Sequence, residues 1–214
     1  MRHIRWFMGM LRHERLQIFA RAICCVPVII CYLLVFEAHS VVYWVSTGGS
    51  DGNACTSIDS VNISTDPGTY KASVNSALTC AGPGDTVQIK DGTYNQNIST
   101  VRDGTQAAPI TIQAQNRRLA VFHPPASAST SQHAVAIRHS WIVLSGLYID
   151  GQETCCFNGM FIFSSHTVIK TGNVIHDNAV FNMNGKFFYA SAQTNLTVRW
   201  NLFSGNGFGG GVND

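Results

Sequence analysis

The sequence predicts an all-β protein that folds as a β-solenoid, in which the chain winds in coils and parallel strands stack on one another. The main observation is a near-repeat in the second half of the chain. Its three copies cover residues 141–151, 167–178 and 196–206, and Ile149, Ile175 and Phe203 are expected at matching points. The resulting period of roughly 26–28 residues is typical of units that bury their apolar face only by stacking on copies of themselves.

The second observation is that apolar residues alternate over short runs bounded by Gly, Pro, Asn or Asp, as they do in strands. Besides two strands in each repeat, the sequence predicts strands at 41–45, 86–90, 109–114, 119–122, 134–137, 160–163 and 185–189. One helix is predicted over 69–80, after the turn at 66–69, because Tyr70, Val74, Ala77 and Leu78 recur at three- and four-residue spacing. This helix is well placed to cap the N-terminal end of the stack. No similar segment follows the last repeat, so the sequence predicts that the solenoid is incomplete at its C-terminal end.

The N-terminus is typical of a secretory signal peptide. Residues 1–21 contain five arginines, an apolar run of fifteen residues covers 22–36, and Ala38-His39-Ser40 offers small residues for cleavage. Fifteen apolar residues are fewer than the roughly 20 that a membrane-spanning helix needs. We therefore predict a signal segment at 1–40 and an exported β domain at 41–214. An uncleaved signal anchor, which would hold the protein at a membrane, is the alternative.

Without residues 1–40 the charge is close to balanced. Lys and Arg fall from 14 to 9 because five arginines leave, and Asp and Glu fall from 12 to 10 because Glu14 and Glu37 leave. This balance argues against a nucleic-acid partner. A monomer is expected.

Four cysteines remain after the signal segment: Cys55, Cys80, Cys155 and Cys156. In an oxidising compartment three pairings are possible. We favour Cys55–Cys80, which closes a loop around the predicted helix, although reduced or intermolecular cysteines stay an alternative. Three Asn-X-Ser/Thr sequons, at Asn62, Asn97 and Asn195, are candidate glycosylation sites.

Several motifs resemble those of one known superfamily. Residues 43–53 resemble the opening strand and "GSDxN" loop of the pectin-lyase-like proteins. Residues 81–87 with 91–94 resemble their "A-x-PGDTV…xGTY" signature, and 108–112 resemble their "xPITI" strand. The resemblance covers roughly 41–206 and is nearest to the chondroitinase-B-like group of polysaccharide lyases. It implies a right-handed parallel β-helix with an N-terminal capping helix.

The resemblance also implies a chemistry. Lyases of this superfamily neutralise the carboxylate of an acidic sugar with a cation, often calcium or a basic side chain, and remove a proton with Lys or Arg. Lys170 and Arg199 are expected at nearly equivalent points of successive repeats, with Lys186 between them and His176 nearby. These four are the candidate catalytic residues. Asp150 and Asp177 are candidate calcium ligands, although a turn-stabilising role explains them better than calcium binding does; no cofactor is certain.

Two functions follow from these expectations. The first is a secreted, carbohydrate-active protein, and more specifically a polysaccharide lyase that cleaves an acidic glycan by β-elimination. The alternative is a non-catalytic solenoid that serves as a glycan-binding, adhesin or structural surface module.

Overall fold

The computed structural model describes residues 40–55, 69–125, 133–155, 158–163 and 168–205. The predicted signal segment up to residue 39 and the sequon at Asn62 lie outside these residues. No helix in the described part of the chain has the length and apolar character required to cross a membrane.

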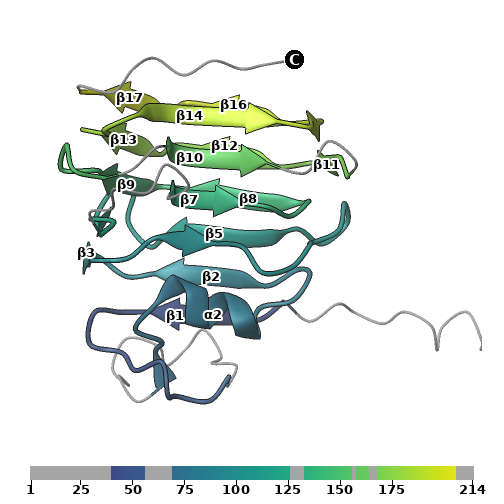
Figure 1. Ribbon diagram of the computed structural model, residues 1–214. Helices are drawn as coiled ribbons and strands as arrows, with labels where there is room; N and C mark the ends of the chain where they lie inside the picture. The colour runs from purple at the N-terminus through teal and green to yellow at the C-terminus, as the bar shows by residue number, and fades with distance from the viewer. Residues whose placement is uncertain (1–39, 56–68, 126–132, 156–157, 164–167, 206–214) are drawn as a thin grey trace, which may run out of the picture. The chain divides into compact units, whose positions relative to one another are not determined.

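The described residues form three main parallel sheets and one short pair of strands (Figure 1). Sheet A contains, in spatial order, β1 (Val42–Val45), β2 (Thr86–Ile89), β5 (Ile110–Ala114), β8 (Ile142–Ser145), β12 (Val174–His176) and β16 (Thr197–Arg199). Sheet B contains β3 (Gly92–Tyr94), β6 (Ala120–Phe122), β9 (Leu147–Asp150), β13 (Ala179–Phe181) and β17 (Leu202–Ser204). Sheet C contains β4 (Ile98–Ser99), β7 (His133–Ile137), β10 (Asn158–Phe163) and β14 (Lys186–Ser191), and the short pair is β11 (Lys170–Thr171) with β15 (Gln193–Thr194). From β2 onward the chain visits sheets A, B and C in turn, so each complete lap adds one strand to each sheet.

Apolar side chains form continuous rows inside the stack. In sheet A, Val87 pairs with Ile112, Ile112 with Leu144, and Leu144 with Ile175, and all four side chains are fully buried. Their sequence neighbours point outward, as the two-residue period of a strand requires. The predicted all-β class and the parallel pairing of strands are therefore confirmed for the described residues.

The predicted alignment of the repeats is wrong by one strand. Ile149 pairs with Val180 in sheet B, and Val180 pairs with Phe203, whereas Ile175 belongs to sheet A. The step from Ile149 to Val180 is longer in sequence than the step from Val180 to Phe203, so the laps do not share one period. They differ because the connections 151–157 and 164–173 are replaced in the next lap by the shorter connections 182–185 and 192–196. Strands of sheets A and B have similar patterns, so a single period could not tell them apart.

Helix α2 (Val74–Cys80) confirms the predicted helix but is shorter than expected. Ser73 caps its N-terminus by accepting a hydrogen bond from the Ser76 N–H at 3.1 Å. Val74, Ala77 and Leu78 bury its apolar face against the core beside β1 and β2.

The helix does not begin at 69 because the preceding residues pair with β1. The Lys71 N–H donates to the Trp44 carbonyl at 2.9 Å, and the Ser46 N–H donates to the Lys71 carbonyl at 2.9 Å. Backbone groups committed to this bridge cannot form the first helical turn. Tyr70 is buried, as its apolar spacing predicted, but it lies outside the helix.

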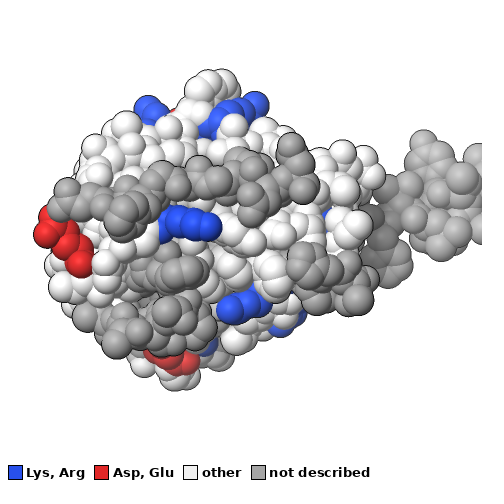
Figure 2. All heavy atoms as spheres, turned by 45° about the horizontal axis from the view of Figure 1, so that its top comes forward, with Lys and Arg blue, Asp and Glu red and all other residues white. Residues whose placement is uncertain are grey.

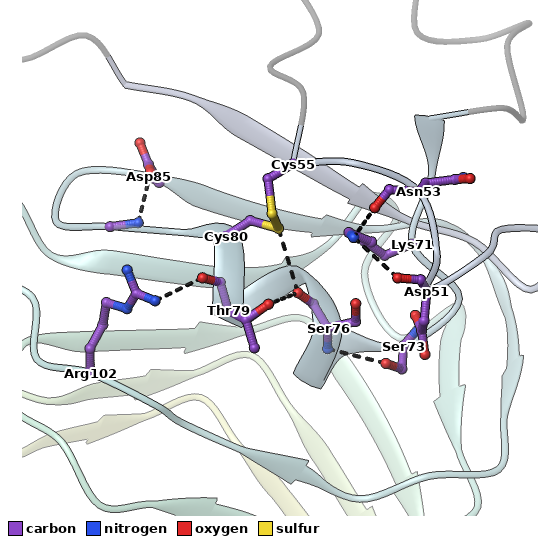
Figure 3. The surroundings of a disulfide bond; sticks show 11 residues. Asp51, Asn53, Cys55, Lys71, Ser73, Ser76, Thr79, Cys80, Asp85 and Arg102 are labelled. Carbon is purple, nitrogen blue, oxygen red and sulfur yellow. Dashed lines mark hydrogen bonds between the residues drawn. A yellow bond between two sulfur atoms is a disulfide. The ribbon is translucent and has the colours of Figure 1, made fainter.

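A disulfide joins Cys55 to Cys80 at the end of α2, as predicted (Figure 3). Around it, Lys71 Nζ donates to the carbonyls of Asp51 and Asn53, and these bonds attach the loop after β1 to the segment before α2. Cys155 is also disulfide-bonded, and its partner lies outside the described residues.

Asparagines support the turns. Asn178 is fully buried: its Oδ1 accepts from the Leu147 N–H at 3.0 Å, and its Nδ2 donates to the carbonyls of Leu144 and His176. Asn173 and Asn201 make similar bonds to neighbouring laps. Each amide side chain thus replaces a ladder bond at the corner where the strands turn.

Candidate functional site

The outer face of sheet C is the best-formed candidate site. Three polar side chains lie in one row across neighbouring strands: His133 on β7 pairs with Asn158 on β10, which pairs with Lys186 on β14. Parallel strands in register place such residues about 4.8 Å apart. The row brings an imidazole, an amide and an ammonium group together from three successive laps of the chain.

Aromatic rings flank this row. The Phe161 ring stacks on the His133 ring with centroids 3.8 Å apart, and it stacks on the Tyr189 ring at 5.5 Å. Phe161 and Tyr189 are paired in register and are partly exposed. Lys186 Nζ lies 4.9 Å from the centroid of the Tyr189 ring, within the range of a cation–π interaction. The face therefore combines a flat aromatic platform with a cation at its edge.

His133 is neutral at physiological pH. Burial, assisted by the positive charge of Arg138, lowers the pKa of His133 to about 4. Asn158 is 1% exposed, and its Nδ2 lies 3.2 Å from His133 Nδ1. In this orientation His133 Nδ1 accepts, so its proton sits on Nε2; with the amide reversed, Nδ1 would donate and Nε2 would accept.

Asn158 also has an unused polar atom. Its Oδ1 is buried without a hydrogen-bond partner among the described residues, and reversing the amide would leave Nδ2 unpartnered in its place. An unsatisfied buried polar group is unfavourable by about 1–3 kcal/mol, so it needs a reason. Asn158 is closed off from solvent, so its contribution to the row is the contact with His133 rather than a contact with a ligand.

The four residues predicted as catalytic lie in three places. Lys186 is on sheet C. His176 and Arg199 are neighbours in register on sheet A. Lys170 starts β11, pairs with Gln193, and forms an ion pair with Asp103 at 3.1 Å. The expectation that Lys170 and Arg199 occupy equivalent points is therefore wrong, because it used the same shifted alignment as the repeats.

The two candidate calcium ligands also lie apart. Asp150 pairs in register with Phe181 and not with Asp177, which comes earlier in the chain. Asp150 accepts from Gln152 and Asn182, and Asp177 contacts Arg117 and His176. Within the described ranges no group of three or more His, Cys, Asp or Glu side chains is close enough to hold a metal ion. Asp150 and Asp177 therefore do not belong to one such cluster, and calcium binding by either stays a prediction.

Sequence reasoning missed His133, Asn158, Phe161 and Tyr189. The spacing of Phe161 and Phe163, two residues apart in a predicted strand, is a signal for two aromatic side chains on one face. Nothing local links this pair to His133, which lies one lap earlier in the chain. Figure 2 shows Lys and Arg side chains in separate groups on the face it displays, with acidic side chains toward its edges.

The two predicted glycosylation sites within the described residues differ in their surroundings. Asn195 is exposed, and its Nδ2 donates to Thr171 Oγ1 at 3.3 Å. Asn97 is half-buried, and its carbonyl accepts from Asn75 Nδ2 on α2. Glycosylation at both stays a prediction, with Asn195 the more accessible.

The described chain is thus a mostly β protein of stacked parallel strands with one short helix. The sequence profile of the chondroitinase B family matches residues 69–168. This match makes that part of the chain similar to the chondroitinase B family, and it agrees with the resemblance of the chain's motifs to those of pectin-lyase-like proteins.

A solved structure is also similar. The crystal structure of an alginate lyase from Paenibacillus sp. str. FPU-7 matches with a TM-score of 0.49 and 20% sequence identity, over 59% of this chain and 40% of the lyase chain. The chain therefore spans less than half the length of the lyase that it matches. A search of curated protein sequences found no match.

Proposed function

We propose that the chain is an exported right-handed parallel β-helix protein, capped by α2, whose sheet C binds an acidic polysaccharide. The observation that carries this proposal is the row His133–Asn158–Lys186 beside the stacked rings of Phe161 and Tyr189. Export rests on the basic and apolar N-terminal segment.

Each part of this face suits a sugar that carries a carboxylate. Partly exposed aromatic rings provide flat apolar surface for the C–H face of a pyranose ring. The Lys186 ammonium can pair with the carboxylate in a charge-assisted hydrogen bond. A ring nitrogen of His133 supplies a hydrogen bond to a hydroxyl group.

The same groups suit lyase chemistry, which the chondroitinase B match favours. In β-elimination a base removes the proton at C5, the electron pair forms the C4–C5 double bond, and the C4–O bond breaks. The leaving oxygen then takes a proton. Lys186 beside the carboxylate would stabilise the negative charge that develops there. His133 is neutral because of its low pKa. It can therefore take up the C5 proton and give a proton to the leaving oxygen.

A non-catalytic glycan-binding module is the second candidate. Two observations favour it. Lys170 is held in an ion pair with Asp103, and Asp150 lies apart from Asp177. These predicted residues therefore do not form one catalytic centre with Lys186.

The test is absorbance near 235 nm during incubation with alginate, pectate or chondroitin sulfate, with and without calcium. We expect unsaturated product from at least one polymer, and its loss in Lys186→Ala and His133→Ala. Lys170→Ala is the matched lysine control and should keep activity. Binding without product, weakened by Lys186→Ala, would establish the module. Loss of activity in Lys170→Ala but not in Lys186→Ala would contradict the sheet C site.

A further inference from the structure

A second group of charged side chains lies at the corner where the chain passes from sheet A to sheet B. On four successive laps this corner is occupied by Arg118, Gly146, Asp177 and Trp200. All four have left-handed backbone conformations, with φ of 64°, 73°, 59° and 55°. Backbone hydrogen bonds connect the laps: the Arg118 N–H donates to the Gly146 carbonyl, and the Gly146 N–H donates to the His176 carbonyl.

The Arg118 side chain crosses this corner past Gly146, and its guanidinium reaches the next two laps. Its Nε donates to the Asp177 carbonyl at 3.2 Å, and one Nη lies 3.5 Å from the Trp200 carbonyl. These contacts hold a full positive charge against backbone carbonyls, with no carboxylate among the bonds described for this side chain.

The corner carries more positive than negative charge. Arg117 forms an ion pair with Asp177 at 2.9 Å, and Asp177 also contacts His176 Nδ1 at 2.8 Å. Among the described residues, Arg199 has no ion pair with a carboxylate. Three arginines against one aspartate leave an excess of positive charge, before any charge on His176 is counted.

An exposed aromatic side chain accompanies this charge. Trp200 is 66% exposed, and the Arg199 guanidinium lies 4.5 Å from the centroid of its ring. Arg199 is itself exposed and lies beside His176 in register. An exposed tryptophan beside an arginine that has no carboxylate partner among the described residues is a combination that binds a ring carrying a negative charge.

We propose that this corner, formed by Arg117, Arg118, Arg199 and Trp200, is a second binding site for an anionic sugar, separate from the sheet C face. Arginine binds a carboxylate or a sulfate group through two parallel hydrogen bonds. Asp177 competes with the ligand for Arg117 and so limits the affinity. The site does not depend on catalysis or binding at sheet C.

The test uses the whole protein and its Lys186→Ala variant, titrated with an alginate hexasaccharide, a heparin hexasaccharide and neutral cellohexaose. Binding is followed by calorimetry and by tryptophan fluorescence. We expect one or both anionic probes to bind in both backgrounds and cellohexaose to bind at least tenfold more weakly. Preference between the two anionic probes distinguishes carboxylate from sulfate as the recognised group.

Variants at the corner make the proposal specific. Arg199→Ala should weaken binding about tenfold, Arg199→Lys less, and Arg102→Ala, a control whose guanidinium bonds the Thr79 carbonyl, should leave it unchanged. Asp177→Asn should strengthen binding severalfold, because Arg117 is released while asparagine tolerates the left-handed turn. A merely structural role for Asp177 would not produce this gain.

The proposal fails if Arg199→Ala binds as tightly as the parent, if Asp177→Asn does not bind more tightly, or if neither anionic probe binds in the Lys186→Ala background. None of these results would bear on lyase activity at sheet C, which the absorbance assay measures separately.

Discussion

Lys170 donates to both carboxylate oxygens of Asp103, at 3.1 and 3.4 Å, although the two residues are 67 positions apart. Asp103 also accepts the Ser140 N–H at 2.7 Å. The three residues precede β5, β8 and β12, so the carboxylate connects three successive laps at one corner.

The first prediction concerns this connection. Partial burial would raise the pKa of Asp103, but the Ser140 N–H and the Lys170 ammonium outweigh it, so the pKa is lowered overall. A lowered folded-state pKa gives stability that is present above the unfolded-state value and lost as the pH falls through the folded-state value. Because Asp103 is half exposed, we expect Asp103→Asn to lower the free energy of unfolding by only about 0.5–1 kcal/mol at pH 7.

Urea denaturation of both proteins at pH 7, 5 and 3 measures this effect. The difference between Asp103→Asn and the parent should shrink at the lowest pH. A difference that stays constant down to pH 3 would show that the charge of Asp103 contributes nothing.

The second prediction concerns His133, whose folded-state pKa of about 4 lies below the ordinary value of 6.5. Between these values the unfolded chain binds a proton that the folded protein does not, so stability decreases as the pH falls from 6.5 toward 4. The loss from this group is at most roughly 3 kcal/mol, at 1.36 kcal/mol per pKa unit. His133→Gln removes the titration, and its free energy of unfolding should fall less over this range. Parallel curves for the two proteins would contradict the low pKa.

The third prediction concerns the asparagines at the corners. Asn178→Ala removes the acceptor for the buried Leu147 N–H and the donor to the Leu144 and His176 carbonyls. Each buried group left unsatisfied is unfavourable by about 1–3 kcal/mol, so we expect a loss of at least about 2 kcal/mol. Asn201 is partly exposed, and water can replace its bonds. Asn201→Ala is therefore the matched variant with a smaller loss, and equal urea midpoints for the two would contradict this account.

The sequence was sufficient for the strands, the helix and the all-β class, because these depend on short-range patterns. The alternation of apolar residues predicted the strands β5 and β8. In the structure Ile112 and Leu144 lie on the buried faces of these strands. The pairing of Cys55 with Cys80 followed from the helix between them. The shift in the repeats arose because lap length is set by the connections, and those vary without any signature in the strands that they join.

The candidate site depends on contacts that no local pattern encodes. His133 and Lys186 share a face because the intervening connections have particular lengths, and those lengths place β7, β10 and β14 in register. Lys170 and Lys186 are both lysines in predicted strands, and the sequence alone does not distinguish them. The strand register, however, places Lys170 beside Asp103. The role of Lys186 could therefore be inferred only after the strands had been assigned to sheets.

The fourth prediction concerns the disulfide between Cys55 and Cys80, which are 25 residues apart. Crosslinking a loop of this length removes conformational freedom from the unfolded chain, which stabilises the folded state by about 3 kcal/mol. Replacing both cysteines by serine tests this bond alone, whereas a reducing agent would also break the disulfide of Cys155. We expect the double variant to unfold at a lower urea concentration with an unchanged far-ultraviolet circular dichroism spectrum before unfolding, because hydrogen bonds of Lys71 and Arg102 still attach the segments around α2. Equal urea midpoints for the variant and the parent would show that these hydrogen bonds hold the segment without the crosslink.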